Sequence, residues 1–430
     1  MKIIRYSLLT IAFTLLFLNI SLADDPAFEN DEQIKIFNNA VIEFNNKNYS
    51  AVIEAVNQLM AVNPNVAQSY NLRGNSYFAL GKYDSAIADF TKAIEINKGF
   101  TEAYRSRAET YRSQQKYDLA LNDMNRLIEI EPENSNYYFN RGILFRESND
   151  LAHSFSDLSR SIALNPKNTN ALLARADVLY ALEDFVQAKL DLDTCIKFND
   201  KSLDAYKLRG MVNYRLKDYD ASIADYAQVE KLDSKDASVY YYRGAVYLEQ
   251  GKYTNALTDL TSAINKGFTA DDMIYYNRAV AYYYLDESDK AIADLNIVMK
   301  SKQDIYLYDL RASIYYKQKK YNEAIEDFSK VLTANPNNIA AIKNRANCYF
   351  NLEKYTEAIS DFTKSIVADP NDASLYHNRA NCYRALEQYA AAIDDCRKFV
   401  EFATGNPEYQ SYVEDVQKEI EYLEYKMNEK

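Results

Sequence analysis

Apolar and small residues recur along the chain with a period of 34 residues. Residues 339–372 show the pattern most clearly, and the next 34 residues carry the same residue types at the same offsets. Within each copy, positions 1 to 14 and 18 to 31 are typical of two helices, and a Gly, Glu, Asn or Lys near position 15 separates them. The pattern therefore predicts a tandem array of helix–turn–helix units, which bury their apolar faces only by stacking on their neighbours.

Eleven such units fit between residues 33 and 406. Position 8 is Gly or Ala in every unit, and position 20 is Ala or Ser in all units but the first. Small residues at fixed points on two successive helices allow the close backbone approach that dense packing requires. Position 17 is mostly Tyr, and five units have Pro at position 32, where a helix must already have ended. The units begin at Gln33, Ala67, Thr101, Ser135, Thr169, Leu203, Ala237, Asp272, Ile305, Ile339 and Ala373.

These columns resemble the tetratricopeptide repeat, whose pattern has a small residue at 8, Tyr at 11, Ala at 20, an aromatic residue at 24, Ala at 27 and Pro at 32. The resemblance covers residues 33–406 and implies an all-α, right-handed superhelical solenoid. Three units depart from the pattern, and we expect them to be softer. The departures are Leu151, His153 and Ser154 in the fourth unit, Asn213 in the sixth and Ser288 in the eighth.

The two ends of the chain lie outside the repeats. Residues 1–23 have two basic residues, an apolar run and small residues near the end, a layout typical of a secretory signal peptide; an uncleaved membrane anchor is the alternative. Residues 24–32 form an acidic leader without apolar period, which we expect to be disordered. Residues 407–430 predict a final helix that opens at Pro407 and caps the last repeat. Its apolar face comprises Tyr409, Tyr412, Val413, Val416, Ile420, Leu423 and Met427.

Charge and composition narrow the classes of function. Removal of residues 1–23 would leave 48 basic and 62 acidic residues, a net charge of −14, which disfavours a nucleic-acid partner. The repeats and the final helix leave no room for a separate catalytic domain. With only His153 and His377, no Gly-rich phosphate loop and no CxxC pair, the sequence predicts no catalytic residue, metal site or cofactor. The four cysteines are predicted to be buried free thiols, with disulfides as the alternative.

Two charged columns run through ten consecutive units. Position 7 is Arg and position 23 is Asp in each of them, and the first unit lacks both. The joint absence predicts that the Arg and Asp of one unit pair across its two helices, since the guanidinium fork suits a carboxylate. A basic stripe for an anionic ligand is the alternative. The arginines are Arg73, Arg107, Arg141, Arg175, Arg209, Arg243, Arg278, Arg311, Arg345 and Arg379.

The resemblance also implies where a ligand binds, namely a concave groove formed by positions 2, 5, 6, 9, 12 and 13 of the first helices. Those positions are rich in Asn and Tyr. Asn amides can donate to and accept from a peptide backbone, and Tyr offers amphipathic contact area. The Asn column resembles the Asn ladder of O-linked N-acetylglucosamine transferase, and an Asn-rich composition is the alternative explanation. For the tyrosines, too, composition is the alternative, since the chain has 39 Tyr and no Trp. The candidate groove residues are Asn277, Tyr283, Tyr316, Lys343, Asn344, Asn347, Asn378, Asn381 and Arg384.

Taken together, the sequence favours an exported, periplasmic or extracellular, non-enzymatic scaffold. Its expected partners are protein or peptide segments held in the groove, and it would touch a membrane only if the signal segment stayed uncleaved. The alternative is a carbohydrate or cell-wall binding module, in which Tyr rings would stack on sugars and Asn amides would bond hydroxyl groups.

Overall fold

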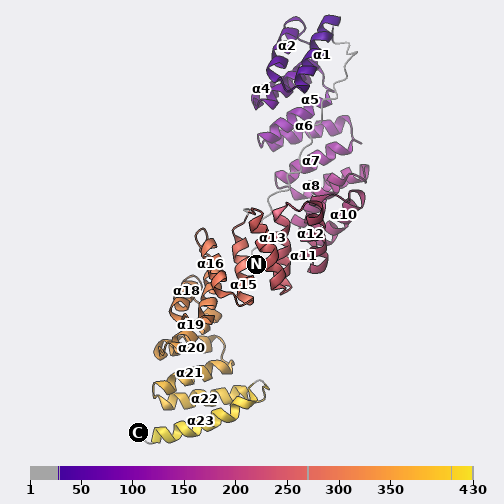
Figure 1. The fold of residues 1–430 in the computed structure, drawn as a ribbon. Helices are drawn as coiled ribbons and strands as arrows, with labels where there is room; N and C mark the ends of the chain where they lie inside the picture. Colours follow the sequence, from indigo (N-terminus) through magenta and orange to yellow (C-terminus); the bar gives the residue numbers. More distant parts are fainter. Residues whose placement is uncertain (1–27, 29, 269–270, 408, 429–430) are drawn as a thin grey trace. The chain divides into compact units, whose positions relative to one another are not determined.

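The computed structural model describes residues 28, 30–268, 271–407 and 409–428. In this part of the chain all regular structure is α-helical (Figure 1). The helices are α1 (Asp31–Asn45), α2 (Tyr49–Val62), α3 (Ala67–Ala79), α4 (Tyr83–Ile96), α5 (Thr101–Ser113), α6 (Tyr117–Ile130), α7 (Ser135–Glu147), α8 (Leu151–Leu164), α9 (Thr169–Ala181), α10 (Phe185–Phe198), α11 (Leu203–Arg215), α12 (Tyr219–Leu232), α13 (Ala237–Glu249), α14 (Tyr253–Asn265), α15 (Met273–Tyr284), α16 (Ser288–Val298), α17 (Ile305–Lys317), α18 (Tyr321–Ala334), α19 (Ile339–Asn351), α20 (Tyr355–Ala368), α21 (Ala373–Ala385), α22 (Tyr389–Ala403) and α23 (Gln410–Asn428).

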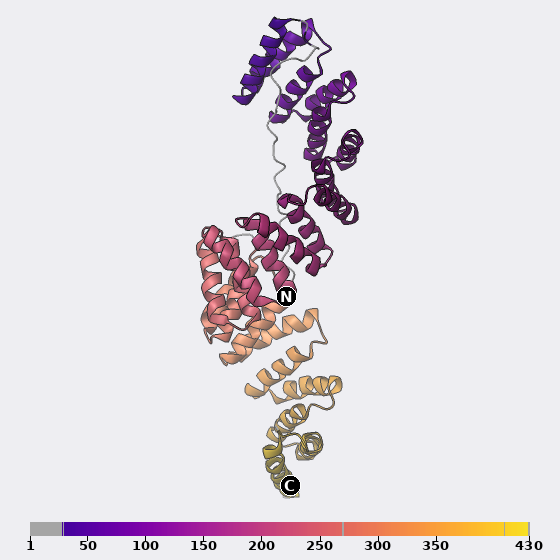
Figure 2. The same ribbon diagram turned by 90° about the vertical axis from the view of Figure 1, so that its right-hand side faces the viewer.

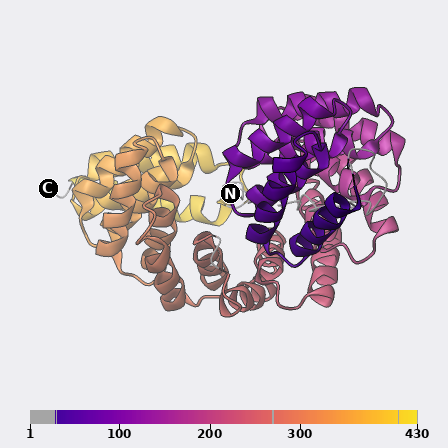
Figure 3. The same cartoon turned by 90° about the horizontal axis from the view of Figure 1, so that it is seen from above.

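The helices form eleven consecutive pairs and one final helix, arranged in two compact units, Met1–Ser234 and Lys235–Lys430. Within each unit every helix packs on the next one in the chain, as Figure 2 and Figure 3 show for successive pairs. First helices of most neighbouring repeats also contact each other, for example α13 with α15 and α15 with α17, whereas among the described residues second helices do not do so to a similar extent. The first helices therefore lie closer together and form the inner row of each unit. The predicted all-α solenoid is confirmed.

The small residues of position 8 let the two helices of a repeat approach closely. A Cβ atom added to Gly74 would lie 2.7 Å from the Phe90 ring, and one added to Gly210 would lie 2.9 Å from the Tyr226 ring. In each case the facing ring belongs to position 24 of the same repeat. Both rings are fully buried, so the apolar core of each repeat is centred on this contact.

Two of the departures from the repeat pattern form hydrogen bonds of their own. The Ser154 hydroxyl donates to the carbonyl oxygen of Gly142 at 2.7 Å, and the Asn213 amide donates to the carboxylate of Asp225 at 2.9 Å. Ser154 and Asn213 are both buried, and these bonds offset part of the cost of burying their polar groups. In the eighth repeat, Ser288 forms no such bond to any described residue, and the second helix α16 has only 11 residues.

The beginning of the chain corrects one expectation. Residues 1–23, the predicted signal peptide, lie outside the described residues. The leader, however, is ordered at its end, because α1 begins at Asp31 and the Phe28 ring packs 5.1 Å from Phe37. Asn30 caps this helix by accepting a hydrogen bond from the Gln33 backbone at 3.0 Å. Among the described residues, no helix has both the length and the apolar character that a membrane span requires.

The final helix also differs from its prediction. It begins at Gln410 and not at Pro407, which lies in the turn before the helix. Val413, Val416 and Leu423 are buried against the last repeat, as expected for a cap. Tyr412 and Met427 are exposed, so the buried face is narrower than the apolar pattern indicated.

Candidate binding surface on the first helices

The Arg and Asp columns form a ladder inside the repeats. In each of the ten repeats, Nε and Nη2 of the arginine donate to the two carboxylate oxygens of the aspartate of the same repeat. The aspartate side chains are at most 10% exposed and the arginine side chains at most 22%. The predicted pairing is confirmed, and the guanidinium groups are not arranged as an open anion-binding stripe.

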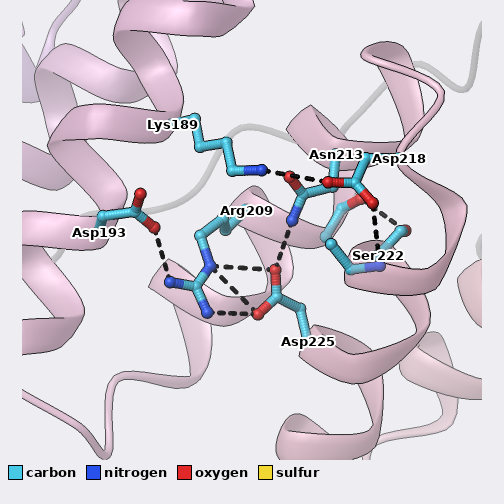
Figure 4. Close-up of polar contacts among 9 residues, drawn as sticks. Lys189, Asp193, Arg209, Asn213, Asp218, Ser222 and Asp225 are labelled. Atoms are coloured by element: carbon cyan, nitrogen blue, oxygen red, sulfur yellow. Dashed lines mark hydrogen bonds and ion pairs between the residues drawn. The ribbon is translucent and has the colours of Figure 1, made fainter.

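The ladder continues between repeats through a column that sequence reasoning missed. In at least eight repeats, Nη1 of the arginine donates to a polar side chain at position 25 of the preceding repeat. Figure 4 shows one example, in which Arg209 bonds Asp225 in its own repeat and Asp193 at 2.7 Å in the preceding one. The signal was present in the sequence, since position 25 is polar in every repeat except the sixth, which has Ala227.

Many tyrosines also belong to this framework. Tyrosines at positions 4 and 11 flank the ladder arginine, one turn of helix on either side of it. In the ninth repeat the Arg311 guanidinium carbon lies 5.9 Å from the centre of the Tyr308 ring and 5.8 Å from that of Tyr315. Such cation–π contacts recur in most repeats, for example at Arg107 and Arg379. Tyrosines in these two columns are therefore structural, and only those at groove positions are candidates for recognition.

Four predicted amides form one row in the last two repeats. Asn344 and Asn347 lie on α19, and Asn378 and Asn381 lie at the same positions on α21. All four are half-buried. Within the described residues their side-chain amides form no hydrogen bond, although the backbone oxygens of Asn347 and Asn378 each accept one. An amide has both donor and acceptor capacity, so the row can pair with an extended peptide backbone.

Asn277 differs from these four amides. It is only 7% exposed, and it lies beside Tyr241, whose hydroxyl donates to the carboxylate of Asp271 at 3.3 Å. Burial raises the pKa of Tyr241 and the neighbouring Asn277 side chain acts in the opposite direction. The structure therefore places Asn277 beside a buried tyrosine instead of on the open surface.

The other predicted groove residues differ in how far their side chains are already held by contacts within the protein. Lys343 is already held, since Nζ lies 2.8 Å from the carboxylate of Asp372 at the end of its own repeat and 3.1 Å from the Ser374 hydroxyl of the next repeat. Arg384 donates to Glu419 of the final helix at 2.7 Å. The Tyr283 ring lies under the Lys317 ammonium group, 5.1 Å from ring centre to Nζ, and Tyr316 is 37% exposed.

His377 is the one histidine inside this region. It lies on α21 with its ring 5.2 Å from that of Phe399, and its Nδ1 atom is buried without a hydrogen-bond partner. Burial lowers the pKa of His377 from its ordinary value of 6.5; Glu419 opposes this effect, and Arg384 reinforces it weakly.

This environment predicts a pH dependence of stability. Because the pKa of His377 is lower in the folded state, the unfolded chain binds a proton first as the pH falls. The stability of the second unit should therefore be retained above pH 6.5 and decline below it, and His377→Gln should reduce the slope of that decline. Melting curves between neutral and mildly acidic pH measure the slope, with the exposed His153→Gln as the matched control. Equal slopes in wild type and His377→Gln would contradict the assignment.

The four cysteines are buried free thiols, in agreement with the preferred expectation. Burial raises the pKa of the Cys195 thiol to about 11 and that of Cys348, Cys382 and Cys396 to about 12. Within the part of the chain that the structure describes, no group of three or more His, Cys, Asp or Glu side chains is placed to hold a metal ion.

Comparison with known proteins gives matches over several repeats. Family models described as tetratricopeptide repeat match residues 67–100, 101–134 and 362–394, and one described as TPR repeat matches residues 210–251. A model for subunit 3 of the anaphase-promoting complex matches residues 295–365.

Individual proteins match over shorter stretches or with low identity. The chicken DnaJ homolog subfamily C member 3 is 37% identical over 91 residues, which are 21% of this chain and 18% of that protein. The chain thus spans about a fifth of the length of the curated relatives it matches. A tetratricopeptide repeat protein from Parabacteroides merdae has a TM-score of 0.44 at 19% identity, covering 59% of this chain and 99% of that one. A repeat protein from Cytophaga hutchinsonii has a TM-score of 0.49 at 17% identity, covering 56% and 98%.

The family matches fall on helix pairs whose boundaries follow the 34-residue period. They occur in both units of the chain. Together with the repeated helix pairs of the described residues, they show that the chain is a tetratricopeptide repeat protein.

Proposed function

We propose that the chain is an exported, non-enzymatic scaffold that binds extended segments of partner proteins along the first helices of its C-terminal repeats. The tetratricopeptide fold supports protein or peptide partners in general. The observation that carries the proposal is the row of Asn344, Asn347, Asn378 and Asn381, because these half-buried amides have no hydrogen bond within the described protein.

The spacing of the row fits a strand-like ligand. Each of the two repeats presents one amide at position 6 and one at position 9, three residues apart and therefore on one face of the helix. A peptide laid along α19 and α21 would meet a pair of amides at each repeat. Backbone pairing of this kind gives affinity without a strict choice of side chains, which suits a scaffold with several partners.

Export rests on the layout of residues 1–23 alone. If these residues are a cleaved signal peptide, the protein isolated from its own cells begins near Asp24, and mass spectrometry of its N-terminus tests this. A protein that begins at Met1 would refute cleavage.

The class of ligand is tested by capture. The immobilised chain should retain material from a detergent extract of its own cell envelope, and digestion of that extract with a protease should abolish retention, because the ligand is a polypeptide. Treatment of the extract with glycosidases should have no effect. Retention that survives the protease and is lost after glycosidase treatment would instead establish the carbohydrate-binding function.

A further inference from the structure

Asp309 lies on the inner row of the second unit, and among the described residues its carboxylate has no hydrogen-bond or ion-pair partner. Asp309 occupies position 5 of α17 and is half-buried. Its backbone oxygen accepts a hydrogen bond from the Ser313 hydroxyl at 2.9 Å, but within the described residues its carboxylate takes part in no hydrogen bond or ion pair. Burial raises the pKa of Asp309, and no nearby cation opposes the effect. An uncompensated charge in such a position is costly for the free protein.

The lack of a partner follows from the next repeat. One repeat later, position 5 is Lys343, and it binds Asp372, the last residue of its own repeat, and Ser374 of the next repeat. The residues at the equivalent positions for Asp309, 34 residues earlier in the sequence, are Asn338 and Ala340. The Asn338 side chain is already used as a helix cap for the Ala341 backbone, and Ala340 is exposed and has no polar side chain.

Three lysines of the eighth to tenth repeats already form ion pairs. Lys302 lies 3.2 Å from a carboxylate oxygen of Asp271, Lys317 pairs with Asp286, and Lys343 pairs with Asp372. Each of these cations thus has its own aspartate. The carboxylate of Asp309, in contrast, has no ion pair among the described residues.

Tyrosine rings lie beside the carboxylate. Tyr276 holds the same position 5 in the preceding repeat, and the charge of Asp309 adds to burial in raising its pKa. The Tyr276 ring meets Tyr306 edge to face at 5.1 Å, and Tyr306 lies one helical turn before Asp309 on α17. Electron-rich ring faces next to a carboxylate form an environment that attracts an organic cation.

We propose that Asp309, with Tyr276 beside it and Tyr306 one turn away on the same helix, binds a lysine or arginine side chain, so that the segment bound along the first helices is a basic peptide. The long apolar stem of such a side chain would lie on the rings while its charged end meets the carboxylate. This inference rests on the proposed function and specifies the chemistry of the partner. The net charge of −12 for the whole chain would also steer a basic segment toward the protein.

The test uses a fluorescein-labelled peptide of alternating lysine and alanine and the same peptide with every lysine acetylated. Fluorescence anisotropy with the full chain should show binding of the first peptide and at least about fivefold weaker binding of the second, the loss expected of one charged contact. Asp309→Asn should weaken binding of the basic peptide by a similar factor. Glu326→Gln, which removes the same charge from the exposed face of α18 in the same repeat, should leave it unchanged.

Folding of the variant can be checked independently, because removal of an uncompensated carboxylate should leave the melting temperature equal or higher. Equal losses in Asp309→Asn and Glu326→Gln would reduce the effect to overall charge and overturn the inference. Failure of the basic peptide to bind would also overturn it. If captured neutral or acidic segments still bound, and Asn344→Ala weakened their binding, the proposed function would stand and only the preference for basic segments would be refuted. If no polypeptide bound, the proposed function and this inference would both be refuted.

Discussion

Replacement of Asp294 by alanine is expected to lower the free energy of unfolding of the second unit by about 3 kcal/mol, the scale seen when one partner of a buried ion pair is removed. Arg278 donates to the two oxygens of Asp294 at 2.7 and 2.8 Å, and these side chains are only 15% and 5% exposed. The variant would leave a guanidinium group that is largely buried and has lost its carboxylate. Asp394→Ala, at an aspartate side chain that is 79% exposed, should cost about 0.5 kcal/mol or less.

The double variant Arg278→Ala with Asp294→Ala distinguishes pairing from independent roles. Since removal of both partners leaves no uncompensated charge, its destabilisation should be smaller than the sum of the two single effects. Chemical denaturation of the full chain, with hydrogen exchange of the amides of α15 and α16, measures all three variants. Additive effects would show that the two side chains do not act as a pair.

The ladder could be predicted from the sequence because its two columns appear and disappear together. The first repeat has Asn39 and Ala55 where the others have Arg and Asp, and this joint absence is the signature of a contact. The inter-repeat bond of the same arginine was harder to find. Its acceptors at position 25 are Asn, Thr, Ser or Asp, and a column shared by several polar residue types looks like ordinary solvent-exposed surface.

The ends of the array show where local patterns are insufficient. Asn30, with Gln33 three residues later, is a signal for the N-terminus of a helix. The sequence therefore contained a signal for the start of α1, and sequence reasoning missed it. The exposure of Tyr412 had no such signal. Helical spacing places an apolar residue on a face, but the width of the buried face depends on the surface that α22 and the last repeat offer.

The asparagines predicted to line the groove differ in burial for a similar reason. Asn277 and Asn344 occupy the same position of their repeats, yet the first is buried beside Tyr241 and the second is half-buried, with no side-chain hydrogen bond among the described residues. Which of these states occurs depends on the residue that the neighbouring repeat presents. Asp309 and Lys343 also share one repeat position, and that position alone does not predict which of them has a partner. Lys343 binds Asp372 and Ser374, whereas the residues at the equivalent positions for Asp309 are Asn338 and Ala340.

The central claim, that partner segments bind along the amide row, is tested most directly by changing two members of that row. Asn344→Ala with Asn378→Ala removes two amides whose hydrogen-bonding groups are free in the described protein, so the ligand should lose about two hydrogen bonds of roughly 1 kcal/mol each. A captured partner segment should therefore bind between about tenfold and thirtyfold more weakly in calorimetry. The melting temperature should hardly change, since neither side chain contributes a hydrogen bond to the fold.

Asn337→Ala with Asn371→Ala is the matched control, because it makes the same substitution at exposed turn positions of the same stretch of chain. We predict that calorimetry finds wild-type affinity for this control and a clear loss of affinity for Asn344→Ala with Asn378→Ala. Unchanged affinity in the latter variant, with the protein folded, would contradict the account and leave biased composition as the explanation of the asparagines.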